Sequence, residues 1–294
     1  MSFNLYFYKK KEAPEPGKAM LSEYFKKLHC FTVKTGDNGS EEFFYSNEET
    51  GVYFSFYYSK NESRPDFPDN YSYTGISLSI GCCRPVFFAL EAMPVVESVQ
   101  VDLGFIIQNP LEDTKTTVKY SQEELVQAWE KQNQAEIRAK GKEANLKYLS
   151  REMSLDIWKY SREKEKIQKD LGGKYYVPKI YIIHNKETGE LERAISWPEA
   201  IPQVIPECEY VIVSRTKPGF LGFRKKSQVG ILKYDYLMSK IHKYLNIFDG
   251  PLPGMKILNP FNKLYVLSVF MHMKISGIDK IEAIPMDGFV DVRA

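Results

Sequence analysis

The chain is organised around residues 120–173, which read YSQEELVQAWEKQNQAEIRAKGKEANLKYLSREMSLDIWKYSREKEKIQKDLGG. Ser121 and Glu124 stand at the first and fourth positions of a capping box, in which each side chain accepts the other's free backbone N–H. Apolar residues then recur at roughly helical spacing amid dense charge, and a Gly-Gly pair follows where a helix typically ends. One unbroken helix would be about 75 Å long, more than a domain of this size needs. We therefore expect at least two helices, divided near Gly141 or Ser150.

Length and composition favour a folded chain with a substantial core. The 294 residues are 43% hydrophobic and 14% aromatic, which argues against a disordered protein. The formal net charge is only +2, so the overall charge gives no case for binding nucleic acid or an anionic membrane. We accordingly expect no nucleic-acid partner.

The cysteines and the N-terminus bear on the cellular compartment. Cys30, Cys82, Cys83 and Cys208 show neither CxxC spacing nor a zinc-ligand pattern, so we interpret them as buried thiols in a reducing compartment. The lysines at 9–11 interrupt the N-terminal segment before any secretory signal core could form. No window approaches the roughly 18 apolar residues of a membrane span. The sequence therefore predicts a soluble, cytoplasmic protein that contacts no membrane.

Residues 1–118 form a first region of strands and helices. Residues 52–58 place Val52, Phe54, Phe56 and Tyr58 on one face and two tyrosines and a serine on the other, and residues 76–80 alternate between large apolar residues and serine, which predicts two half-buried strands. Apolar residues at 20–28 have the spacing of an amphipathic helix. In the segment 84–94 we expect a helix that starts at Pro85 and is ended, or passed to a second helix, at Pro94.

Two charged residues in that segment are candidates for a buried ion pair, Arg84 and Glu91. Glu91 lies within an apolar run, so it needs a partner if it is buried, and Arg84 is near. The favoured interpretation is a structural pair at a strand–helix junction. The alternative is a carboxylate with a raised pKa in a cleft, beside the small-residue face of residues 76–80.

Residues 175–294 form a second region of the same kind. A hairpin is predicted around the turn at 185–190, a buried strand at 210–213, and helices at 235–248 and 261–273. The fold class predicted for the whole chain is α+β, with two mixed, mostly antiparallel sheet regions joined by a charged helical segment. The predicted boundaries are 1–118, 119–174 and 175–294.

A search for chemical motifs finds none with catalytic spacing. The sequence contains no P-loop, no dinucleotide-binding glycine pattern, no GxSxG elbow and no HExxH. The scattered histidines, His29, His184, His242 and His272, suggest no metal site. A nuclease-like Asp…Glu-x-Lys arrangement can be assembled from Glu190, Glu207 or Glu209, but no segment supplies it cleanly. We therefore expect no metal and no cofactor, and the prediction is that the protein is not an enzyme.

The best candidate for a binding element is the loop that contains Phe220, Phe223, Arg224, Lys225 and Lys226. Its aromatic residues provide anchors and its cations provide charge, so it suits a phosphate or an acidic protein surface. A solvated hairpin tip is the competing interpretation. The charged helical segment leaves the same choice open, between solvent-exposed ion pairs and a docking surface.

Four segments carry a resemblance to a known family: residues 1–7 (MSFNLYF), 50–56 (TGVYFSF), 84–94 (RPVFFALEAMP) and 196–211. Together they resemble a family of uncharacterised bacterial proteins of about this length. Some proteins of this kind look like immunity partners of secreted polymorphic toxins. The resemblance implies a bacterial protein that binds a cognate toxin.

The leading hypothesis is a non-enzymatic, protein-binding immunity protein that neutralises a cognate secreted toxin by direct binding. The alternative is a hydrolase or nuclease-like enzyme with a site near Glu91. A third possibility is a protein that binds small ligands within the first region.

Overall fold

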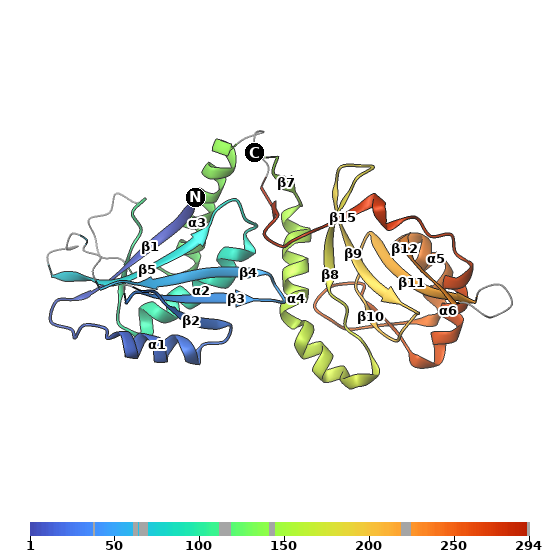
Figure 1. Ribbon diagram of the computed structural model, residues 1–294, viewed down its shortest axis with the longest axis horizontal. Helices are drawn as coiled ribbons and strands as arrows, with labels where there is room; N and C mark the ends of the chain where they lie inside the picture. The colour runs from blue at the N-terminus through green and yellow to red at the C-terminus, as the bar shows by residue number, and fades with distance from the viewer. Residues whose placement is uncertain are drawn as a thin grey trace. The chain divides into compact units, whose positions relative to one another are not determined.

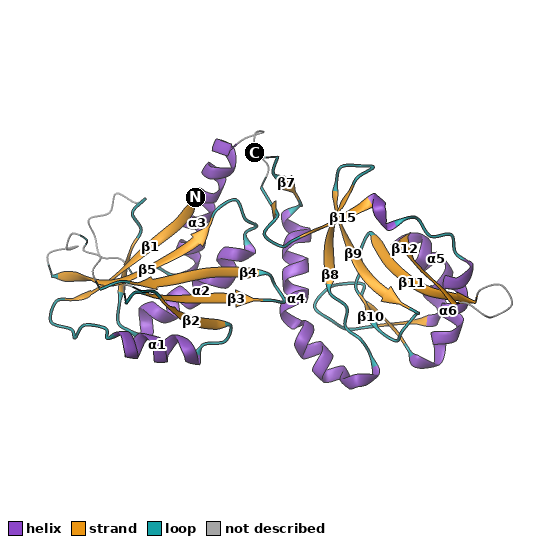
Figure 2. Ribbon diagram, in the orientation of Figure 1, coloured by secondary structure: helices purple, strands orange, loops and turns teal. Residues whose placement is uncertain are grey.

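The computed structural model describes residues 1–37, 39–60, 64, 70–111, 119–140, 145–218 and 225–292. The chain divides into two compact units (Figure 1). The first contains Met1–Leu146 together with Phe289–Ala294, and the second contains Lys147–Gly288. Both units combine helices with mostly antiparallel sheets, which confirms the predicted α+β class (Figure 2).

The first unit is built on a six-stranded antiparallel sheet with the strand order β2-β3-β4-β5-β1-β6. Alternating residues explain its two faces: Val52, Phe54 and Phe56 are buried on one face, while Tyr57 on the other face is exposed. The strands are β1 (Ser2–Lys10), β2 (Phe31–Thr35), β3 (Glu41–Asn47), β4 (Val52–Tyr58), β5 (Tyr71–Gly81) and β6 (Ile106–Gln108).

Aromatic rings form the core of this unit. Phe25, on helix α1 (Lys18–Lys27), stacks on Phe43 of β3 with ring centroids 4.3 Å apart and lies 5.0 Å from Phe56 of β4. These rings bury large apolar areas and favour offset or tilted contacts, which fixes α1 on that face of the sheet. The core is therefore built by the alternating aromatic residues that the sequence places on the strands.

The helix after β5 differs from the prediction. Helix α2 (Phe87–Asp102) contains Pro94 in its interior, so the expectation that Pro94 ends the helix or starts another was wrong. An interior proline removes one backbone hydrogen bond and costs about 3 kcal/mol. Helix α2 offsets this by burying eight side chains against the unit, Phe87, Phe88, Ala89, Ala92, Met93, Val96, Val99 and Gln100. Tertiary packing thus overrides the local signal.

The charged middle segment is two helices, as predicted, with the break where the sequence suggested it. Helix α3 (Gln122–Lys140) begins with the capping box: Ser121 N donates to Glu124 Oε2 at 2.8 Å and Glu124 N to Ser121 Oγ at 3.3 Å. Helix α4 (Arg151–Leu171) is capped by Ser150 and ends at Gly172, whose φ is 63°. Helix α3 belongs to the first unit and α4 to the second, so the compact units divide within the predicted 119–174 segment.

The second unit contains a five-stranded sheet in the order β12-β11-β9-β8-β15 and a three-stranded sheet in the order β10-β14-β13. The pair β9 and β11 is parallel, and the other strand pairs are antiparallel. The strands are β8 (Ile180–Asn185), β9 (Leu191–Pro198), β10 (Val204–Ile205), β11 (Tyr210–Pro218), β12 (Lys225–Lys233), β13 (Leu245–Ile247), β14 (Lys256–Leu258) and β15 (Ile281–Ile284).

Two helices accompany these sheets. Helix α5 (Tyr234–Ile241) is shorter than the predicted helix at 235–248, because Leu245–Ile247 pairs with β14 as strand β13 instead. Helix α6 (Lys263–His272) follows a short 3-10 turn, η5 (Pro260–Asn262), and agrees with the predicted helix at 261–273. None of the helices in the described part of the chain is long and apolar enough to cross a membrane.

The end of the described chain returns to the first unit. Two short strands bracket the second unit, β7 (Lys147–Tyr148) at its start and β16 (Phe289–Val290) just after it. Val290 packs with Cys83 and Ile137, and Asp291 Oδ2 accepts the backbone N–H of Val86 at 2.8 Å, at the start of α2. A carboxylate at a helix N-terminus is favourably placed for the helix dipole. The first unit is therefore assembled from segments at both ends of the sequence.

Candidate functional site

The structure describes little of the predicted binding loop. Phe220, Phe223 and Arg224 lie outside the described residues. Lys225 and Lys226 begin strand β12, but their side chains are not described either. The proposal that this loop binds a partner is therefore carried forward as a prediction.

Glu91 is the centre of a polar cluster in the first unit. Its Oε1 accepts hydrogen bonds from Tyr45 Oη at 2.7 Å, from Asn47 Nδ2 at 2.8 Å and from Thr50 Oγ1 at 2.9 Å. Asn47 and Thr50 belong to the β3–β4 turn, and Thr50 is fully buried. Burial, followed by the neighbouring Glu91 carboxylate, raises the pKa of Tyr45 far above its ordinary value. Glu91 thus fastens α2 to a hairpin turn, which is a structural role.

Arg84 contributes to the same end of the sheet. Its Nη1 donates to the carbonyl oxygen of Cys83 at 3.2 Å and its Nη2 to Tyr53 Oη at 3.0 Å. The side-chain oxygen of Asn133, on α3, accepts the N–H of Cys83 at 2.6 Å. Arg84 and Glu91 are each half-buried, and the predicted ion pair between them stays a prediction.

The enzymatic alternative would place a site near Glu91 and the serine face of β5. Tyr45 stacks on Phe54 at 4.5 Å, and Phe56 of the same face pairs with Leu78. Because strand residues alternate between faces, Ser77 and Ser79 point to the opposite side of the sheet. The hydrogen bonds of Glu91 to Tyr45, Asn47 and Thr50 do not test a catalytic role, and the enzymatic alternative stays a prediction.

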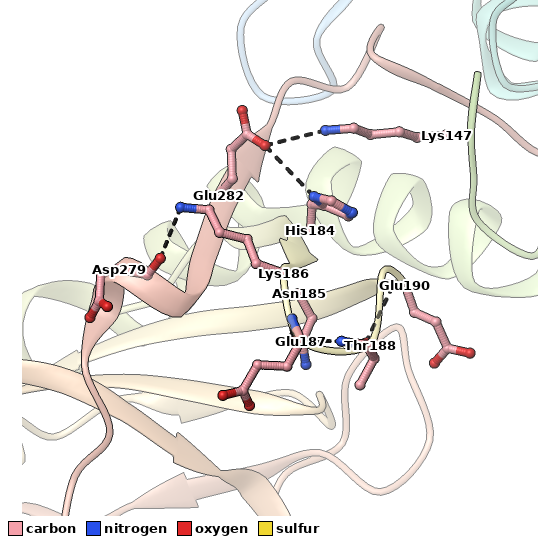
Figure 3. A network of polar contacts seen from close by, with 9 residues as sticks. All are labelled: Lys147, His184, Asn185, Lys186, Glu187, Thr188, Glu190, Asp279 and Glu282. Carbon is pink, nitrogen blue, oxygen red and sulfur yellow. Dashed lines mark hydrogen bonds and ion pairs between the residues drawn. The ribbon is translucent and has the colours of Figure 1, made fainter. Parts of the chain in front are cut away.

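Several charged residues of the second unit form a surface network around the β8–β9 turn and β15 (Figure 3). Glu282 Oε2 lies 3.4 Å from Lys147 Nζ and 3.7 Å from His184 Nδ1, while Lys280 Nζ lies 2.7 Å from Glu187 Oε1. Such partly exposed ion pairs contribute about 0–1 kcal/mol each to stability. We interpret the network as solvated surface ion pairs at the edge of the five-stranded sheet.

One carboxylate of the nuclease-like pattern, Glu209, is hydrogen-bonded within the second unit. Glu209 is held by Arg193, whose Nη2 donates to Oε1 at 2.7 Å and whose backbone N–H donates to Oε2 at 2.7 Å. Within the described ranges, no three His, Cys, Asp or Glu side chains gather as a metal site requires. His184 contacts one carboxylate, Glu282.

A surface that sequence reasoning missed lies on α6. This ten-residue helix, KLYVLSVFMH, is mostly apolar, yet its buried residues are two, Val266 and Phe270. Phe261, Leu264 and Tyr265 are 89%, 75% and 59% exposed. Helices that are apolar all round are normally buried. Helix α6 therefore presents an apolar stripe that the second unit does not cover.

Neighbouring elements extend this stripe. Tyr265 stacks flat on Tyr244 of the 3-10 turn η4 (His242–Tyr244), with centroids 5.4 Å apart and an interplanar angle of 3°. Asn262 Nδ2 donates to the carbonyl oxygen of Tyr244 at 2.9 Å, which ties η5 to η4. We call the surface formed by Tyr244, Phe261, Leu264 and Tyr265 the aromatic face; Tyr236, which is also exposed, lies on helix α5, which contacts α6.

Lysines accompany the aromatic face. Lys243 Nζ lies 5.0 Å from the ring centroid of Tyr244, and Lys240 Nζ lies 5.8 Å from that of Tyr236. Lys263 precedes Leu264 in the chain. Cation–π contacts of this kind hold ammonium groups beside aromatic rings. The aromatic face is therefore bordered by positive charge.

The sequence held one signal for this surface, which is the uninterrupted apolar character of residues 264–267. On its own that signal predicts burial, so only the exposed fractions show that this part of α6 faces solvent. In comparisons with known proteins, the chain matches no protein-family model, no curated protein and no solved structure. The functional argument therefore rests on the geometry of the described residues.

Proposed function

We propose that this protein acts by binding another protein, and that the aromatic face is its contact surface. The observation that carries the proposal is the exposure of Leu264 and Tyr265 on the mostly apolar helix α6, together with that of Phe261 in the turn η5 just before it. Contiguous exposed apolar patches with polar rims mark interaction sites, because leaving them in water is unfavourable. Aromatic residues are also enriched at protein–protein interfaces.

The lysines bordering the aromatic face favour a partner with an acidic surface. Lys240 and Lys243 lie against the rings, where a partner's carboxylates would meet them at the rim. Rim charges of this kind raise the association rate and set specificity more than they raise affinity. Since the net charge of the whole chain is only +2, this attraction is local.

The narrower proposal is that the partner is a cognate secreted toxin and that the protein is a bacterial, cytoplasmic immunity protein. Its support is the family resemblance of residues 1–7, 50–56, 84–94 and 196–211 together with a surface suited to protein binding. Binding would block the toxin directly, without catalysis by this chain.

The first experiment is a pull-down from the native host, followed by calorimetry with the product of the adjacent upstream gene. We expect a one-to-one complex with a toxic neighbour. Leu264→Asp should weaken it by about tenfold or more, because a central apolar anchor of an interface contributes more than about 1.4 kcal/mol. The matched control is Leu111→Asp in the first unit, since Leu111 is also 60% exposed.

Two outcomes would overturn the proposed surface. Equal affinities for the Leu264→Asp and Leu111→Asp variants would remove the aromatic face. Loss of binding on charge reversal of Arg224, Lys225 and Lys226, with Leu264→Asp unaffected, would assign the contact to the predicted loop instead. A clean absence of any complex, with both proteins folded, would reject the toxin partner and favour the enzymatic alternative.

A further inference from the structure

The second unit buries an arginine that has no carboxylate partner among the described residues. Arg215 lies on β11 and is 3% exposed. Its Nε donates to Gln228 Oε1 at 3.1 Å, and its Nη1 donates to the carbonyl oxygens of Phe270 and Met273, the latter at 2.7 Å. All three acceptors are neutral. A buried charge is normally paired with an opposite charge, because burial removes it from water.

The three hydrogen bonds fix the guanidinium in place but do not use all of its donors. Phe270 and Met273 lie at the end of α6, where the helix dipole is negative and favours a cation. A guanidinium carries five N–H donors in a rigid planar fork, and three are used here. The two on Nη2 donate to no residue in the described part of the chain.

A hollow of about 640 Å³ that is open to solvent lies beside Arg215 in the second unit, and we call it the cavity. Strand β12 forms one wall and the segment after α6 the other. The second wall is fixed by Ser276, which exchanges backbone hydrogen bonds with Ile231 at 3.0 and 3.1 Å. The described lining includes no carboxylate, and its polar members are Arg215, Ser227, Gln228, His272, Lys274 and Ser276.

We infer that this cavity binds the phosphate group of a small phosphorylated molecule. The free Nη2 group of Arg215 can donate to an oxyanion oxygen, and Lys274 adds a second positive charge. Two cations suit a phosphate monoester, which carries about −1.5 to −2 charges at neutral pH, better than they suit a single carboxylate. The hydroxyls of Ser227 and Ser276 are further donors.

The size of the cavity points to an organic phosphate rather than the free ion. Small-molecule sites range from about 300 to 1,000 Å³, and the volume here falls within that range. An inorganic phosphate would fill only part of it. This inference is independent of the proposed protein partner, because none of the lining residues belongs to the aromatic face.

The test is calorimetry on the full chain in phosphate-free buffer, with inorganic phosphate, ribose 5-phosphate and acetate as probes. We expect saturable binding of both phosphates, tighter for ribose 5-phosphate, and no binding of acetate. No saturable heat from either phosphate at millimolar concentrations would overturn the inference. Acetate binding as tightly as inorganic phosphate would also overturn it, because the double positive charge would then not be selecting a dianion.

Variants locate the site. Lys274→Gln should weaken ribose 5-phosphate binding several-fold without moving the thermal midpoint, since Lys274 is exposed. Arg215→Lys should weaken it about tenfold or more, because the Nη2 donor to the phosphate is lost, with circular dichroism checking that it folds. Lys174→Gln is the matched control, as it removes the same charge from an exposed position outside the cavity lining. Equal affinity in the Lys274→Gln variant and the control would assign binding elsewhere.

Discussion

Glu91 shows how one carboxylate can organise part of a fold without being a reactive group. Three uncharged donors, from Tyr45, Asn47 and Thr50, converge on a single oxygen of Glu91. The side-chain oxygen of Asn47 also accepts the N–H of Glu49 at 3.1 Å. The turn is therefore stabilised both by its own hydrogen bonds and by those to Glu91 on α2. Charge-assisted hydrogen bonds are stronger than neutral ones, which makes this cluster a sensitive point for stability.

At the residue scale we predict that Glu91→Gln lowers the free energy of unfolding by about 1–3 kcal/mol. The amide removes the negative charge that strengthens all three hydrogen bonds, and it presents an N–H₂ group to neighbours that are already donors. Urea denaturation of the full chain measures the change. Glu97→Gln on the same helix is the control, since Glu97 accepts no hydrogen bond from the described residues, and it should leave the free energy nearly unchanged.

An unchanged midpoint for Glu91→Gln would contradict the structural role of Glu91. If that variant also lost a hydrolytic activity shown by the unmodified protein, the enzymatic alternative would replace the structural interpretation. Denaturation and activity measurements on this variant therefore distinguish a structural from a catalytic role of Glu91.

At the scale of elements, the starts of the two middle helices followed local sequence signals closely, while the lengths of α2 and α5 did not. The capping box at Ser121 and the cap at Ser150 depend on residues within one turn of each other. The run through Pro94 in α2 and the early end of α5 depend on packing and on pairing with β14. Local hydrogen bonds thus decide where α3 and α4 begin. Tertiary contacts decide how far α2 and α5 extend.

For α4 we predict that Ser150→Ala lowers the free energy of unfolding of the second unit by about 1 kcal/mol. The Ser150 hydroxyl accepts the backbone N–H of Met153 at 3.3 Å, and alanine leaves that donor without its cap. Denaturation followed by fluorescence of Trp158 and Trp197, with Trp129 replaced by Phe, reports on this unit. Ser150→Thr keeps the acceptor and should restore most of the loss, whereas equal losses for both variants would show that the cap is not responsible.

At the scale of the whole molecule, both units bury groups that resist ionisation. Burial raises the pKa of the Cys82 thiol to about 11, with the neighbouring Glu136 carboxylate adding to the shift. Burial also raises the pKa values of Cys208, Tyr45 and Tyr234 well above their ordinary ranges. These groups are neutral in the folded protein under conditions where the unfolded chain ionises them.

We therefore predict that stability falls as the pH rises above about 8.5, where unfolded cysteines ionise, and falls more steeply above about 10, where tyrosines follow. The sign follows from the raised folded pKa values: the unfolded state holds fewer protons in this window, so alkali favours unfolding. Each group that ionises only in the unfolded chain contributes a slope of up to about 1.4 kcal/mol per pH unit. Urea denaturation from pH 7.5 to 10.5 measures it.

The control for this profile is Cys208→Ala, which should make the decline between pH 8.5 and 10 shallower, since one buried thiol is removed. A profile that stays flat up to pH 10.5 would contradict the buried neutral state of these groups. An unchanged slope in Cys208→Ala would assign the effect to the remaining groups.

The sequence by itself determined the α+β class, most of the strands, the two middle helices and their caps. These features depend on period-2 alternation, on 3.6-residue spacing and on side chains that bond to backbone groups a few positions away, all of which are local. Only the tertiary structure decided which donors bond to Glu91 and which unit each middle helix joins. It also decided that residues of the apolar helix α6 are exposed and that Arg215 lines a cavity. Each of these depends on which distant segments meet, because burial and pairing are properties of the assembled fold rather than of any stretch of sequence.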